Sequence, residues 1–64
     1  MTKLKELRIR GGYTQREIAK EAGICERQYI RIENGERLTN VVTAIRIARF
    51  LKTTVEDCFA DILP

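Results

Sequence analysis

The sequence contains no histidine, no serine and no tryptophan, and its only proline is the last residue. Without histidine the chain lacks the commonest general base, and without serine it lacks a common hydroxyl nucleophile. Its two cysteines, Cys25 and Cys58, form no CxxC pair, so the ligand cluster of a zinc site is also missing. We therefore expect neither an enzyme nor a protein that binds a metal, a cofactor or a small-molecule ligand.

Long apolar runs are absent as well. The apolar stretches are far shorter than the roughly 18 residues that a membrane span needs. The N-terminal residues, Met1 to Glu6, lack the apolar core of a signal peptide. These observations predict a cytoplasmic protein without membrane association, and a reducing cytosol favours two free thiols over a disulfide.

The sequence does contain enough apolar residues for a small core. Leu, Ile, Val and Phe make up 18 of the 64 residues, which is too many for a disordered tail. The length allows one domain, covering residues 1–64. Its stability is expected to be marginal unless its helices pack well or a partner adds to it.

The charges are unevenly distributed along the chain. Residues 1–52 contain all 12 Lys and Arg and six acidic residues, a balance of +6, whereas residues 53–64 contain three acids and no base. A cationic body with an acidic end indicates one surface for a polyanion. An ordinary solvated surface is the alternative interpretation.

Glycine and turn residues divide the chain into five short segments, each with the features of a helix. The predicted helices cover about 2–10, 14–22, 25–33, 40–51 and a short segment after Thr54. In the fourth, the apolar residues that recur with the helical period are Val41, Ala44, Ile45, Ala48 and Phe50 or Leu51. No segment alternates as a strand would. The predicted fold class is all-α, a compact five-helix bundle.

The stretch 15–35 carries most of the information on function. A helix that opens with a capping box, Thr14–Glu17, is followed by a turn at Gly23 and by a second helix of similar length. Tyr29 and Ile32 supply the buried side of that second helix. This pattern is typical of a helix-turn-helix, in which the second helix enters the major groove of DNA.

Polar and charged side chains occupy the outward face of the second helix and are of the types that contact base edges. They are Glu26, Arg27, Gln28 and Arg31. DNA contact is the favoured interpretation of Arg27, with a solvated helix residue as the alternative, and Glu26 could instead be an acid favoured by the helix dipole. Arg31 could instead pair with Glu26 or Gln28 along the helix. Three more arginines flank the motif as candidate phosphate contacts: Arg10, Arg16 and Arg37.

The sequence resembles the Cro/C1-type helix-turn-helix family, which includes the lambdoid phage repressors and many small bacterial proteins. The resemblance covers about residues 3–60. It is carried by Tyr13-Thr14-Gln15, Ile18-Ala19, Ala22-Gly23-Ile24, Tyr29, Arg31-Ile32-Glu33-Asn34-Gly35, Ile47-Ala48 and Leu51. It implies a lambda repressor-like fold and a transcriptional regulator, expected to be a repressor, that binds specific sequences in double-stranded DNA.

The resemblance also implies roles for individual residues. Gln15 and Asn34 match phosphate contacts. Cys25, Glu26 and Arg27 match the first positions of the base-contacting helix, and Arg31 matches a further contact one turn on. Arg8 and Glu33 match a pair that ties the first helix to the end of the third. Cys25 replaces the usual Ser or Thr, which predicts a weaker helix cap and makes a redox-active thiol conceivable.

One recognition helix contacts only a few base pairs, which favours a homodimer on a palindromic operator. The predicted dimer surface is the apolar and acidic C-terminal part, from Phe50 through Val55 to Ile62 and Leu63. An alternative function is a protein-interaction module of the antitoxin or immunity type. The two functions overlap, because antitoxins of this family often bind DNA as well.

Overall fold

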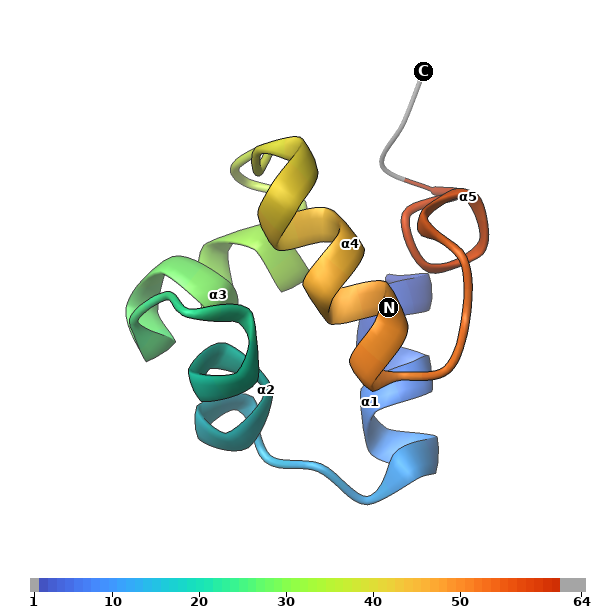
Figure 1. Cartoon of the computed structure of the whole chain (residues 1–64), viewed down its shortest axis with the longest axis horizontal. Helices are drawn as coiled ribbons and strands as arrows, with labels where there is room; N and C mark the ends of the chain where they lie inside the picture. The colour runs from blue at the N-terminus through green and yellow to red at the C-terminus, as the bar shows by residue number, and fades with distance from the viewer. Residues whose placement is uncertain (1, 62–64) are drawn as a thin grey trace.

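The computed structural model describes residues 2–61, and this part of the chain folds as five α-helices. They are α1 (Lys3–Gly11), α2 (Gln15–Ala22), α3 (Glu26–Glu33), α4 (Val41–Phe50) and α5 (Val55–Cys58) (Figure 1). The all-α prediction is confirmed, with a radius of gyration of 10.0 Å. None of these five helices has the length and apolar character that crossing a membrane would need.

Side-chain caps fix where most of the helices begin. Thr2, Thr14, Asn40 and Thr54 each precede a helix and accept a hydrogen bond from the backbone N–H three residues on. These bonds satisfy amides that have no partner within the helix. Cys25 is the exception, because its side chain makes no cap hydrogen bond at the start of α3. The weaker cap predicted there is confirmed.

Left-handed glycines end the first two helices. Gly12 follows α1 with φ 78° and Gly23 follows α2 with φ 76°, a conformation in which a Cβ is unfavourable. A Cβ at Gly23 would also lie 2.8 Å from a guanidinium nitrogen of Arg46 on α4. The positive φ of Gly23 is what constrains the turn between α2 and α3, because the end of the exposed Arg46 side chain can move aside.

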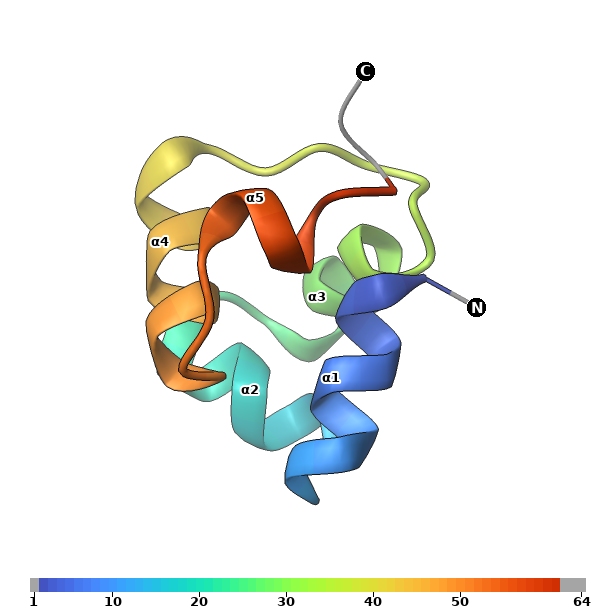
Figure 2. The same ribbon diagram turned by 90° about the vertical axis from the view of Figure 1, so that its right-hand side faces the viewer.

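The core lies where the helices meet. Every helix contributes to it, and the largest buried apolar side chains are Leu4, Ile18, Tyr29, Ile32, Ile47 and Phe59. Helix α2 packs against both α3 and α4, while α5 packs against α1 and α4, as Figure 2 shows from the side. The two helices of the helix-turn-helix are thus held by the rest of the bundle from behind.

Helix α4 corrects one expectation. Val41 and Ile45 were expected on its buried side but are exposed, whereas Thr43 and Ile47 are buried together with the two alanines of the helix. At 100° per residue, Val41 and Ile45 lie to one side of the line from Ala44 to Ala48, and Thr43 and Ile47 lie to the other. Ala44 and Ala48 fit the helical period together with either pair of residues. Hydrophobic periodicity alone therefore predicted the wrong pair to be buried.

Candidate nucleic-acid interface

The turn between α2 and α3 is closed by backbone hydrogen bonds. The N–H of Gly23 donates to the carbonyl of Lys20 (3.2 Å), and the N–H of Ile24 donates to the carbonyl of Ala19 (3.1 Å). Ala19 and Ala22 are buried beside this turn, and their small side chains let α2 and α3 approach closely. Helix α3 is thereby set against α2 with one long face toward solvent.

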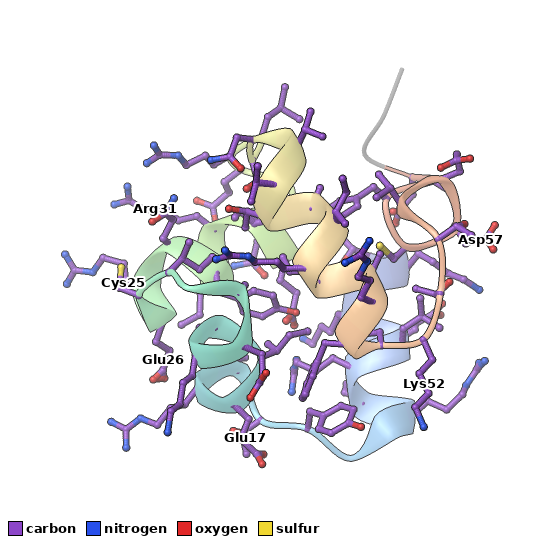
Figure 3. The ribbon with its side chains drawn as sticks, in the orientation of Figure 1. Glu17, Cys25, Glu26, Arg31, Lys52 and Asp57 are labelled. Atoms are coloured by element: carbon purple, nitrogen blue, oxygen red, sulfur yellow. The ribbon has the colours of Figure 1, made fainter. Side chains whose placement is uncertain are left out.

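The solvent face of α3 carries the residues predicted to contact bases. Arg27 and Arg31 are exposed, as is Cys25 before the helix, while Glu26 and Gln28 are half-buried. In Figure 3, Cys25, Glu26 and Arg31 lie on the same side of the molecule. A shallow concave surface on this side is lined by Glu26, Arg27, Ile30, Arg31 and Glu36. The structure therefore brings together the predicted base-contacting residues.

Glu26 makes its ion pair with α2 and not along α3. Its carboxylate lies 3.8 Å from the Arg16 guanidinium, and the two side chains are 42% and 87% exposed. An ion pair this open to water contributes little to stability. Glu26 and Arg16 can therefore leave this ion pair for other polar partners at a small cost in free energy.

The candidate phosphate contacts come from the end of α1, the start of α2 and the residues after α3. Gln15 is the first residue of α2, where free backbone amides favour anions; Arg10 is exposed in the last turn of α1, and Arg37 is exposed in the loop after α3. Asn34 follows α3 and donates from Nδ2 to the carboxylate of Glu36 at 3.2 Å. Glu36 was not singled out from the sequence, because nothing in the local pattern places that acid on the same surface as Arg31.

The capping box at the start of α2 is present in both directions. The Thr14 hydroxyl accepts from the N–H of Glu17 (3.0 Å), and the N–H of Thr14 donates to the Glu17 carboxylate (2.9 Å). These bonds lower the pKa of Glu17 below its usual value. They leave the first amides of α2 pointing outward beside Gln15.

Comparison with known proteins agrees with this geometry. The family model described as "Helix-turn-helix" matches residues 4–58. The chain belongs to the Cro/C1-type helix-turn-helix family. No solved structure matched the chain.

Several curated proteins are similar to this chain over most of their own length. An uncharacterized HTH-type transcriptional regulator, YgzD, from Bacillus subtilis is 32% identical over 57 residues, which cover 89% of this chain and 86% of YgzD. One from Archaeoglobus fulgidus is 33% identical over 58 residues, covering 91% and 83%. A third, MJ0272 from Methanocaldococcus jannaschii, is 35% identical over 57 residues, covering 89% and 86%.

In this helix-turn-helix protein an ion pair connects α1 to the end of α3. Arg8 donates from Nε to one oxygen of Glu33 (2.8 Å) and from Nη2 to the other (3.1 Å). The Glu33 side chain is fully buried and that of Arg8 is 12% exposed. Arg8 also donates to the carbonyl of Tyr13 (2.8 Å), and the Thr2 hydroxyl donates to the carbonyl of Glu33 (2.6 Å). The recognition helix is thus held at its C-terminal end by α1.

Two buried side chains, Tyr29 beside this network and Cys58 on α5, stay neutral. The Tyr29 hydroxyl is buried next to Glu33 and makes no hydrogen bond within residues 2–61. Burial, followed by the neighbouring Glu33 carboxylate, raises the pKa of Tyr29 well above its usual value. Burial also raises the pKa of the Cys58 thiol to about 11. Neither group faces the surface of α3, so both serve the core of the helix-turn-helix fold.

The acidic side chains of the C-terminal segment lie away from α3. Glu56, Asp57 and Asp61 are exposed on and after α5. In Figure 3, Asp57 and Lys52 lie on the side of the molecule opposite Arg31 and Cys25. The acidic end of the helix-turn-helix protein therefore lies away from the surface that carries the exposed arginines of α3.

The residues predicted to form a dimer surface differ in how exposed their side chains are to solvent. Phe50 is half-buried, and its ring packs against that of Tyr13 with 4.4 Å between the centroids and 46° between the ring planes. Val55 is half-buried against the core. Ile62 and Leu63 lie outside the described residues. The structure therefore describes only Phe50 and Val55 of the predicted dimer surface, and both of these side chains also pack against the core.

Proposed function

We propose that this protein is a transcriptional regulator that binds specific sequences in double-stranded DNA. The observation that carries the proposal is the solvent face of α3, where Arg27 and Arg31 stand exposed while α2 and the Arg8–Glu33 pair from α1 hold the helix from behind. A surface that presents forked donors on one accessible helix fits the major groove. The printed names of the similar proteins, HTH-type transcriptional regulators, support the same function.

In this proposal Arg27 selects sequence. It lies near the N-terminus of α3, the end of a recognition helix that contacts base edges, and its guanidinium can donate two hydrogen bonds to O6 and N7 of guanine. Gln28 and Arg31 extend the contact along the same helix. Glu26 can accept from the amino group of cytosine once it leaves Arg16.

Binding strength comes mainly from phosphates. Gln15 and the free amides of α2 hold one phosphate, and the flanking residues Arg10, Arg16, Arg37 and Asn34 hold others. Two chains bound to a palindromic operator would then obstruct polymerase, which makes the protein a repressor. Neighbouring Glu36 on the same surface repels phosphates and so restricts how the backbone approaches Asn34.

The experiment first selects binding sites from random duplexes and then compares variants in mobility-shift titrations. Arg27→Ala is expected to weaken binding to the selected site by about 1–3 kcal/mol and to relax the preference at one base pair. Gln15→Ala is expected to weaken all duplexes alike, because a phosphate contact carries no sequence information.

The matched control is Lys52→Gln, which removes one positive charge on the side of the molecule opposite Arg31. It is expected to leave sequence preference unchanged. An Arg27→Ala variant with the same sequence preference as the wild type would refute the role of Arg27. Failure of the wild type to select any sequence would refute the proposed function as a whole.

A further inference from the structure

Ile30 is an aliphatic residue of α3 that the core does not account for. It is half-buried, but within residues 2–61 it is not one of the half-buried aliphatic side chains that pack against the core. Those side chains are Leu7, Ile24, Leu51 and Val55. Ile30 instead lines the shallow concave surface on the solvent side of α3, with Glu26, Arg27, Arg31 and Glu36. Among the described residues in that lining, Ile30 alone is apolar.

The position of Ile30 on α3 places it between two of the proposed base contacts. At about 100° per residue, Ile30 lies about 40° around the helix from Glu26 and about 60° from Arg27, one turn further along. Because helical side chains point back toward the N-terminus, the Ile30 side chain covers the surface between these two residues. Its methyl groups therefore lie between a carboxylate acceptor and a forked donor.

The two acids in the lining determine which part of DNA Ile30 can contact. A backbone phosphate at this surface would lie against the negative charges of Glu26 and Glu36. The edge of a base carries no net charge and offers donors to a carboxylate and acceptors to a guanidinium. Ile30 therefore faces base edges in the major groove. The apolar group on those edges is the C5 methyl group of thymine, which 5-methylcytosine carries at the same place.

We infer that Ile30 selects a pyrimidine with a C5 methyl group, at a base pair next to the one that Arg27 contacts. The inference rests on the proposed function. Three residues along α3 correspond to a rise of about 4.5 Å, close to the roughly 3.4 Å between successive bases of one strand. Positions 27 and 30 can therefore contact neighbouring base pairs. Burial of one methyl group against Ile30 corresponds to about fourfold in affinity.

The residue that shares the pyrimidine with Ile30 distinguishes the two sources of the methyl group. In 5-methylcytosine the amino group at C4 is next to the methyl group and can donate to the Glu26 carboxylate. In thymine the oxygen at C4 accepts instead, which suits the guanidinium of Arg27. The source that binds more tightly therefore shows which neighbour of Ile30 contacts the same base.

The test changes one methyl group at a time in the duplex selected by the wild type. Each thymine is replaced by uracil and each cytosine by 5-methylcytosine, singly, and affinities are measured by mobility shift. At a position next to the pair where Arg27→Ala relaxes the preference, the methylated duplex is expected to bind the wild type about fourfold more tightly than its unmethylated counterpart. An effect of uracil identifies thymine as the source, and an effect of 5-methylcytosine identifies the modified base.

Three variants assign this ratio to one side chain. Ile30→Ala is expected to lose most of the ratio, and Ile30→Val to keep most of it, because valine retains an aliphatic contact. Ile9→Ala is the matched control, since it removes the same atoms from an exposed isoleucine of α1 and is expected to keep the full ratio. Ile9 and Ile30 both lie outside the core, so the variants are expected to fold, which circular dichroism verifies.

Two results would overturn the inference. One is a selected duplex in which no single methyl group changes the affinity of the wild type, and the other is an Ile30→Ala variant with the wild-type ratio. Failure of the proposed function has a different signature. A wild type that selects no duplex refutes the proposed function and this inference together, whereas a selected duplex that is insensitive to methyl groups refutes this inference alone.

Discussion

Removing the guanidinium of Arg8 is expected to destabilise this protein more than any other single surface-accessible change. In Arg8→Met the apolar stem is kept, but both hydrogen bonds to Glu33 and the bond to the Tyr13 carbonyl are lost. The Glu33 carboxylate then remains fully buried without its counter-charge. A stranded buried charge costs far more than an intact pair contributes.

The expected loss can be compared with the stability of a chain this small. Breaking a buried pair by removing one partner costs about 3–5 kcal/mol, and the slight exposure of Arg8 places this case near the lower limit. A domain of 64 residues is stable by roughly 3–10 kcal/mol. A loss of ~3 kcal/mol corresponds to about 12–24 °C in Tm for a domain of this size. The variant should therefore be partly unfolded at moderate temperature.

Urea and thermal unfolding followed by circular dichroism measure this loss, and two further variants make it interpretable. Arg10→Met removes an exposed arginine from the same helix and is expected to change stability by less than about 0.5 kcal/mol. Arg8→Met/Glu33→Met removes the stranded carboxylate as well and is expected to recover most of the loss. The reasoning fails if Arg8→Met costs less than about 1 kcal/mol, or if the double variant is no more stable than Arg8→Met.

Three smaller predictions concern the cysteines. Cys25→Ser is expected to stabilise the protein by about 0.5–1 kcal/mol in urea unfolding. The reason is that a serine hydroxyl can accept a hydrogen bond from the N–H of Gln28, as the other caps do at the same spacing. An unchanged stability would show that the backbone at position 25 does not allow this hydrogen bond. A thiol reagent is expected to modify Cys25 rapidly in the folded protein and Cys58 only after unfolding, since the first is exposed and the second buried; equal rates would contradict the placement of Cys58. Because burial raises the pKa of Cys58 from 9.0 to about 11, its contribution to stability is complete below pH 9.0 and lost as the pH rises toward 11. Cys58→Ala should therefore lose less stability than the wild type over that interval, and an identical slope would refute the assignment.

Local chemistry made most of the helices predictable. Caps such as Thr14 and Asn40, and glycines such as Gly23, act within four residues along the chain, so the sequence alone locates them. The exposed face of α3 was predictable for the same reason, since Tyr29 and Ile32 identify the buried side of a short helix. Helix ends differed from expectation by only one residue or so.

Contacts between elements could not be derived in this way. The pairing of Glu26 with Arg16 and the bond from Asn34 to Glu36 depend on how α3 sits against its neighbours. The pair of Arg8 with Glu33, 25 residues apart, was expected only from the family resemblance. On α4 the alanines fit two stripes equally well, and only packing against α2 and α5 decides which stripe is buried.

The rotation of α4 decides which of its aliphatic side chains are buried and which contact water. Turning Thr43 and Ile47 inward necessarily turns Val41 and Ile45 outward, beside Val42 and Leu38, which are exposed in any case. A chain with so small a core leaves these aliphatic side chains in water, although burying each would contribute about 1.5–3 kcal/mol. Burial of these side chains against any partner would recover part of that free energy.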